Sequence, residues 1–186
     1  NNSSIAFEII EKDENNKYKY LDNVIINPDF SSLEHFTITA YAGMTKMEEF
    51  EISEYTLENL QFTLTGRDVE DGSIRVYLND PDGKLLELEE VDILKGVGSK
   101  NLYFEKGSPL YKIKYNKDNQ PIIMFGTEEF GGAFEHKHAN GKIIVFYRLA
   151  YGIAGNILTG GINNSQTIKV LDKEYTLNFY NSAPSR

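Results

Sequence analysis

Two histidines close together are the first residues of this chain that could do chemistry. His136 and His138 stand in the segment EHKH, and in an extended conformation both would point to one side and could share a metal ion. A third ligand is not evident, and the dipeptide Asn140-Gly141 that follows is suited to a tight hairpin turn. We therefore interpret the segment as a solvated hairpin tip and predict no metal site.

Carboxylates gather between residues 78 and 92. The loop LNDPDGKLLELE is similar to a calcium-binding loop, with Asp80, Asp82, Gly83 and Glu89 at acceptable offsets. The first ligand position is Leu78, however, and Pro81 stiffens the loop, so a plain hairpin turn is the better interpretation. The overlapping run ELEEVD could supply the paired carboxylates of a glycosidase. That chemistry needs one carboxyl group in a dry pocket, and a charged strand face explains the run more simply.

No other catalytic arrangement is evident in the sequence. No serine lies in a nucleophile elbow, no lysine-bearing phosphate loop occurs, and the chain has no cysteine. We predict that the chain is not an enzyme and that it binds no cofactor, metal ion or small-molecule substrate.

Two glycines follow the apolar segment KIIVFYRLAY. Gly152, Gly155 and Asn156 form the pattern Gly-x-x-Gly-Asn, which could build a phosphate cradle, a sharp corner of a sheet or a feature of one family. A phosphate cradle leads into a helix and usually has a basic residue near its glycines. Here the sequel ILTGGINNSQTIKV is typical of a loop that returns to another strand. From the residues alone, the glycines mark a sheet corner or a close backbone approach.

Composition limits the partners of the chain. Its 186 residues include 28 acidic and 19 basic ones, which gives a net charge of -9. This charge repels phosphate backbones and anionic lipid, so we predict no nucleic-acid partner. No apolar run approaches the roughly 18 residues that span a bilayer, and we predict no membrane insertion. The chain begins without Met and stops at NSAPSR, so we expect a piece of a longer polypeptide.

Strands are the elements that must position these residues. Apolar residues alternate with polar ones along several segments, as expected for strands with one buried face. The apolar members are Phe36, Ile38 and Ala40; Leu60, Phe62 and Leu64; Ile74, Val76 and Leu78; Tyr111, Ile113 and Tyr115; and Tyr175, Leu177 and Phe179. Turn sequences separate these segments, and no convincing amphipathic helix appears. The sequence therefore predicts an all-β fold of antiparallel, sandwich-like sheets.

One predicted strand, at residues 143–150, is apolar on both sides. Its two sides are Ile143, Val145, Tyr147 and Leu149, and Ile144, Phe146 and Ala150, interrupted only by Arg148. We expect this strand to be covered on both faces, either by a second sheet of this chain or by a neighbouring subunit.

A set of residues from 111 to 162 has the order and spacing of a known family. The set comprises a Tyr-rich strand, an apolar strand ending in Phe-Gly, later glycines, a strand ending in Tyr-Arg, and Gly-x-x-Gly-Asn. Its members are Phe125, Gly126, Gly131 or Gly132, Gly141, Tyr147, Arg148, Gly152, Gly155 and Asn156. In these residues the chain resembles the baseplate J-like, or baseplate wedge, family of contractile phage tails and related injection machines. Two departures fall in turns: Thr127 and Glu128 replace the family's Asp-Gly, and residues 135–140 lack its Pro.

The resemblance implies a structural subunit of a contractile-tail baseplate wedge, in which the glycines serve chain geometry. The implied partners are other baseplate wedge proteins and a second copy of the chain. The implied location is the tail baseplate of the virion, after assembly in the cytoplasm of the bacterial host. The resemblance also suggests that residues 1–59 and 136–186 form one β-domain and that residues 60–135 form an inserted β-subdomain.

Two other functions stay open from the residues. The 12 tyrosines and the acidic loops would also suit a carbohydrate-binding β-sandwich, and two of the acidic residues could serve a β-sandwich glycosidase. Titration with glycans would separate the first alternative from an assembly module, and a hydrolysis screen would reveal the second.

Overall fold

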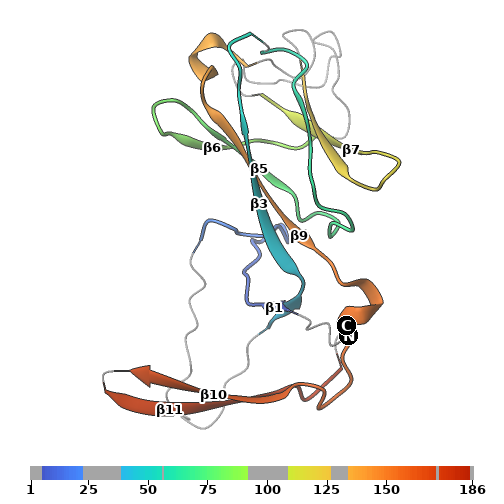
Figure 1. Cartoon of the computed structure of the whole chain (residues 1–186), viewed down its shortest axis with the longest axis vertical. Coiled ribbons are helices and arrows are strands. Elements are labelled where there is room, and N and C mark those ends of the chain that lie inside the picture. Colours follow the sequence, from blue (N-terminus) through green and yellow to red (C-terminus); the bar gives the residue numbers. More distant parts are fainter. Residues whose placement is uncertain are drawn as a thin grey trace. The chain divides into compact units, whose positions relative to one another are not determined.

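The computed structural model describes residues 6–22, 39–55, 57–91, 109–126, 134–170 and 172–184. These residues form antiparallel strands and two short 3-10 helices, which confirms the predicted all-β fold (Figure 1). Among them, no helix has the length and hydropathy of a membrane span. The chain divides into two compact units, Phe7–Ala150 and a second unit made of Asn1–Ala6 and Tyr151–Arg186.

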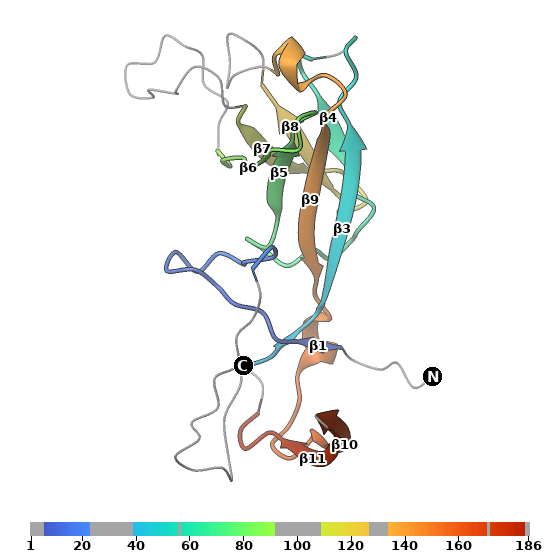
Figure 2. The same cartoon turned by 90° about the vertical axis from the view of Figure 1, so that its left-hand side faces the viewer.

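A four-stranded antiparallel sheet forms the centre of the first unit. Its strands are β3 (Met44–Glu51), β9 (Lys142–Leu149), β5 (Arg75–Asn79) and β6 (Leu85–Glu87), in the order β3-β9-β5-β6. The two long strands β3 and β9 pair along their whole length, and Figure 2 shows them side by side. β9 is an inner strand, as its apolar composition requires.

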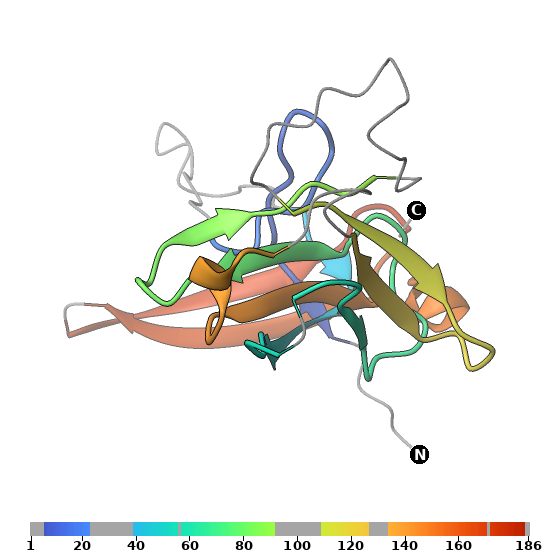
Figure 3. The same ribbon diagram turned by 90° about the horizontal axis from the view of Figure 1, so that it is seen from above.

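A three-stranded sheet encloses the core together with the first. It contains β4 (Gln61–Thr63), β8 (Pro121–Phe125) and β7 (Tyr111–Tyr115), in the order β4-β8-β7. Figure 3 shows the β7–β8 hairpin in yellow and β5 in green from above. Side chains of both sheets and their loops form one buried cluster, Ile52, Leu64, Ile74, Val76, Leu78, Leu88, Tyr111, Ile123, Phe125, Phe134, Ile143, Val145 and Tyr147.

The predicted alternation of buried and exposed residues is confirmed around Leu64 but is wrong for residues 73–78, where Ser73 and Tyr77 of the predicted exposed side are buried as well. Leu64 and Val76 are completely buried, whereas Thr63 and Thr65, the neighbours of Leu64, are exposed. The segment that contains Phe36 and Ile38 lies outside the described residues.

An N-terminal segment, residues 7–22, covers the second face of β9; we call it the strap. Its β1 (Phe7–Glu8) pairs with β2 (Tyr41–Ala42), and the ring of Tyr20 stacks on Phe146 of β9 with 5.4 Å between centroids. The double cover predicted for β9 is therefore present. It comes from the core on one side and, on the other, from this strap, whose β1 forms a two-stranded sheet with β2; Ile144 and Phe146 on that side are half-buried.

The second unit contains η2 (Gly152–Gly155) and one long hairpin. β10 (Asn163–Val170) and β11 (Lys173–Tyr180) pair over eight residues each and form a two-stranded sheet. From Asn156 onward, no residue whose burial the structure describes is buried. The hairpin residues whose burial is described therefore form no core.

The division into compact units does not follow the boundaries that the resemblance suggests. It falls after Ala150, and the segment 60–135 contributes β5 and β6 to the sheet that also contains β3 and β9. The pairing of β3 with β9 does join the early and late segments, as that suggestion requires. The inserted subdomain at 60–135 stays a prediction.

Candidate functional site

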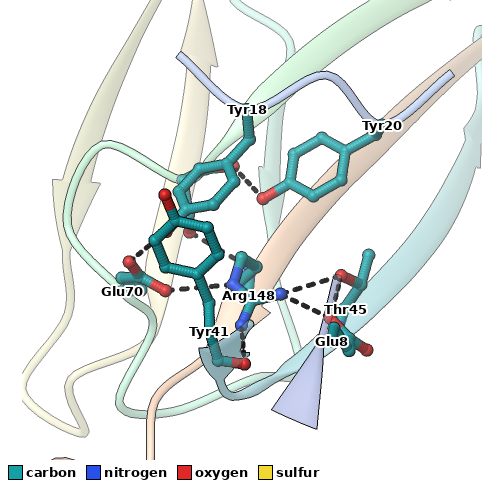
Figure 4. A network of polar contacts seen from close by, with 8 residues as sticks. Glu8, Tyr18, Tyr20, Tyr41, Thr45, Glu70 and Arg148 are labelled. Carbon is teal, nitrogen blue, oxygen red and sulfur yellow. Dashed lines mark hydrogen bonds and ion pairs between the residues drawn. The ribbon is translucent and has the colours of Figure 1, made fainter. Parts of the chain in front are cut away.

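Arg148, near the end of β9, is a completely buried charged residue in an apolar strand. Its guanidinium group donates hydrogen bonds within the chain from Nε to Glu70 Oε2 at 3.1 Å, from Nη1 to Glu8 and to Thr45 Oγ1 at 3.5 Å, and from Nη2 to the carbonyl of Tyr41 at 3.2 Å (Figure 4). A buried cation is costly unless it is paired and hydrogen-bonded. These partners explain how an arginine can lie inside this strand.

The two carboxylates around Arg148 come from distant parts of the chain. Glu8 belongs to the strap, and Glu70 belongs to the loop before β5. Glu8 also accepts hydrogen bonds from the backbone N–H of Thr45 at 2.9 Å and from its hydroxyl at 2.6 Å. Glu70 also accepts one from the hydroxyl of Tyr18. Each of these side chains thus has hydrogen-bond partners inside the cluster, and both carboxylates share the one guanidinium group.

Aromatic rings of the strap complete this cluster. The ring of Tyr18 lies 5.4 Å from the guanidinium carbon of Arg148, and the strap also places Lys12 Nζ 4.2 Å from the centroid of the same ring. The hydroxyl of Tyr20 donates to the carbonyl of Ser73 at 2.7 Å. Burial raises the pKa of Tyr18, and its hydrogen bond to Glu70 raises that pKa further. Tyr18 therefore stays neutral and serves as a hydrogen-bond donor that holds the strap.

Tyr147, the neighbour of Arg148, forms a second cluster. The carboxylate of Glu48 accepts hydrogen bonds from the backbone N–H and the hydroxyl of Thr65, both at 2.9 Å, and from the hydroxyl of Tyr147. The N–H of Gly66 donates to that hydroxyl at 3.1 Å. Burial raises the pKa of Tyr147 to about 12. The hydroxyl is therefore neutral near pH 7, and it ties the loop at residues 65–66 to β3.

The motif residues before β9 occupy packing positions. Phe125 ends β8 in the core, and the carbonyl of Gly126 accepts a hydrogen bond from the N–H of Asn59 at 3.3 Å. At Gly141, a Cβ atom would lie 2.8 Å from the carbonyl oxygen of Asn79, so this turn has room only for glycine. Gly131 and Gly132 lie outside the described residues.

The motif residues after β9 form a bend that leads to another strand. Gly152 has a φ of +52° and open space where a Cβ would lie, Gly155 is buried, and Asn156 is exposed. The chain then continues into β10, which confirms the predicted loop returning to a strand. A phosphate cradle would instead place the N-terminus of a longer helix directly after these glycines.

The interpretation of residues 135–140 as a solvated hairpin tip is wrong for His138. The segment forms the 3-10 helix η1 (His136–His138), and His138 is 6% exposed. Its Nδ1 accepts a hydrogen bond from the N–H of Glu135 at 3.0 Å, and its ring packs edge-on against Phe134. Within the described part of the chain, no group of three His, Cys, Asp or Glu side chains could hold a metal ion.

We expect the protein to lose stability in mild acid through His138. Burial lowers the pKa of His138, and the charge of Lys137 adds to this effect, while Glu135 and Asp80 act in the opposite direction. A histidine whose pKa is lowered in the folded state makes its full contribution to stability when the pH is above its ordinary pKa of about 6.5. This contribution is lost as the pH falls through the pKa of the folded state. Protonation of Nδ1 would also remove the acceptor for the N–H of Glu135.

Urea unfolding between pH 7.5 and pH 5 measures this loss. His138→Asn retains an acceptor without a titrating ring, so its stability should change less with pH than that of the wild type. His136→Asn is the matched control and should keep the wild-type pH dependence. The idea fails if His138→Asn and the wild type lose stability in parallel.

The loop that is similar to a calcium site is a plain hairpin turn, as predicted. Asp80 makes the turn: its carbonyl accepts a hydrogen bond from the N–H of Gly83 at 2.9 Å, and its carboxylate accepts one from the N–H of Lys84 at 2.7 Å. In the neighbouring acidic run, Glu87 forms an ion pair with Arg75, and Asp92 lies outside the described residues.

We expect the melting temperature to be the same with a chelator, with added calcium and with added zinc. A metal site specific to the folded state would stabilise it by mass action. Differential scanning calorimetry checks this expectation, and a rise of several degrees with either metal would contradict it.

The acidic partners of Tyr147 and Arg148 are not evident in the sequence. Glu8 and Glu70 belong to no motif, and Glu48 is one of several carboxylates on β3. A lone arginine in a doubly apolar strand does indicate that carboxylates must lie nearby. Nothing in the sequence indicates which ones, because they are 78 and 140 residues away from Arg148.

No family model matches the chain, and neither the curated proteins nor the solved structures give a significant match. Fold and site define an all-β protein whose buried polar side chains bind its own backbone and carboxylates.

Proposed function

We propose that this chain is a structural module of a contractile-tail baseplate wedge and acts through protein–protein contacts. The proposal rests on the structural role of Tyr147 and Arg148, the pair that matches the family's Tyr-Arg. Both side chains are completely buried and bind carboxylates of their own chain. Side chains used in this way stabilise a scaffold and are not available to a substrate, so the proposal includes no enzymatic activity.

The surface of the second unit supports a role in assembly. A two-stranded hairpin is at best marginally stable in water by itself. β11 nevertheless leaves Tyr175 48% and Tyr180 66% exposed. Contacts with other subunits would bury such side chains. The proposed partners are other baseplate wedge proteins and a second copy of the chain, in the tail baseplate of a virion.

Co-expression with the proteins encoded beside this chain tests the proposal. We expect a complex of fixed stoichiometry in native mass spectrometry. Gly152→Val should weaken this complex, because a β-branched residue is strained at a φ of +52° and the bend leads into the hairpin. Gly83→Val is the matched control, since Gly83 also has a positive φ and open space but lies in the β5–β6 turn.

Two results would overturn the assembly function. One is that the chain stays monomeric when it is co-expressed with each of the proteins encoded beside it. The other is saturable binding in a titration with glycans, which would favour the carbohydrate-binding alternative.

A further inference from the structure

We propose that the chain pairs with a second copy of itself along the outer edge of β11, so that two hairpins form one four-stranded antiparallel sheet about a two-fold axis. The feature that carries this inference is the self-complementary stretch from Tyr175 to Tyr180, which has no charged residue and lies at the edge of the described sheet. The inference rests on the proposed assembly function for the identity of the partner, and it adds the surface and the register of the contact.

β11 has one apolar and one mainly polar face. Residues on one face of a strand recur at every second position, so on β11 itself Tyr175, Leu177 and Phe179 share an apolar face. The other, mainly polar face of β11 has Glu174, Thr176, Asn178 and Tyr180. On β10, the residues opposite the three apolar ones are Ile168, Gln166 and Asn164. Leu177 and Phe179 are only half-buried, and Tyr175 is more exposed. The apolar face therefore lacks a complete cover in the described structure.

β11 is also an edge strand without the usual protection. It pairs with β10 on one side, and among the described residues no other strand pairs with it. Proteins commonly guard such edges with charged residues, proline or bulges. From Tyr175 to Tyr180 the sequence YTLNFY contains neither a charge nor a proline. The edge strand β3 of the other unit differs, since it contains one lysine and several glutamates, Lys46, Glu48, Glu49 and Glu51.

One register makes β11 complementary to itself. With the two-fold axis at Leu177, this residue lies opposite Leu177 of the second copy, and Tyr175 lies opposite Phe179. Glu174 lies opposite Tyr180, so no like charges meet. The apolar faces of both copies then lie on the same side of the sheet. If the two-fold axis passed between two residues of β11, the apolar faces of the two copies would lie on opposite sides of the sheet. A slip of one residue in the pairing register exchanges the two faces of a strand.

The neighbouring register is less favourable. With the axis at Asn178, Tyr175 would lie opposite Asn181, so an aromatic pair would be lost. Self-complementarity about a two-fold axis is the condition for a symmetric dimer contact. A single strand edge is small beside the roughly 800 Å² per partner of a standard interface. We therefore infer weak pairing in the isolated chain, best detected by covalent trapping.

The absence of cysteine from the chain permits a clean cross-linking test. In the proposed register, Thr176 lies opposite Asn178 of the second copy, and both side chains are on the polar face. Opposite residues in antiparallel strands have Cα atoms about 4.5–5.5 Å apart, within the range that a disulfide spans. Diagonal neighbours are about 7–8 Å apart. A mixture of Thr176→Cys and Asn178→Cys should therefore form disulfide-linked heterodimers at least ten times faster than either variant alone.

Three results decide the proposal. Leu177→Lys, added to both cysteine variants, would place like charges together at the axis and should abolish the fast cross-linking. Equal rates for mixed and single variants would indicate random collision and overturn the pairing, as would no cross-linking at millimolar protein. If cross-linking fails while the chain still joins the co-expressed complex, the pairing is wrong and the assembly function stands. If the cross-link forms but the chain does not join the co-expressed complex, the pairing is retained and the assembly function is wrong.

Discussion

Replacing Arg148 by methionine should lower the free energy of unfolding by about 3 kcal/mol. The change leaves the carboxylates of Glu8 and Glu70 without the cation that both bind. Removing one partner of a buried ion pair typically costs about 3–5 kcal/mol, and the lower value applies because each carboxylate is about 30% exposed to solvent. Arg148→Lys should also be destabilising, since one ammonium group cannot reproduce the fork of donors.

Urea unfolding of the variants beside the wild type measures this effect. Lys142→Met is the matched control on the same strand, where the ion pair between Lys142 and Glu49 has both side chains more than two-fifths exposed. Such surface pairs contribute little, and we expect no resolvable change for this control. An Arg148→Met variant as stable as the control would show that the buried cluster does not hold the strap.

The strands could be predicted because their signal is local. The alternation around Leu64 depends only on which face of the strand meets the core, and the structure buries Leu64 between exposed threonines. The double cover of β9 could be predicted for the same reason, from apolar residues on both of its sides. The identity of the cover could not, because the ring of Tyr20 reaches Phe146 across more than half of the chain.

The candidate site shows the same limit. The sequence singled out Arg148 and Tyr147 as members of a motif, and both are buried at the centre of polar clusters. It did not indicate their acidic partners, which are selected by tertiary structure and not by spacing. His138 was misjudged because a polar segment beside Asn140-Gly141 is typical of an exposed turn. Its burial depends on the contact with Phe134, which the composition of the segment does not reveal.

The glycines show that a local sequence pattern does not identify the positions where tertiary contacts require a glycine. The motif drew attention to Gly152, where a Cβ would meet open space. Gly43, between β2 and β3, lies outside the motif residues at 111–162; it is the glycine that precedes a strand in residues 40–64, a segment that also resembles the family. There a Cβ would lie 2.5 Å from Arg148 Nη2 and 2.9 Å from the carbonyl oxygen of Leu149, and φ is +150°. The close approach exists only because β3 and β9 pair beside the buried guanidinium.

Gly43→Ala should therefore lower the free energy of unfolding by about 3 kcal/mol, since it combines backbone strain with displacement of a buried charged group. Gly72→Ala is the matched control: Gly72 has a φ of +69° and nothing within 4 Å of a Cβ position, so only backbone strain of about 1 kcal/mol applies. Urea unfolding compares the two variants. If the Gly43 effect acts through Arg148, the same change should cost less in the Arg148→Met background, because substitutions at residues in contact are not additive. Additive costs in the double variant would mean that the methyl group collides with the backbone of Leu149 alone, and that the buried guanidinium is not the reason for a glycine at this position.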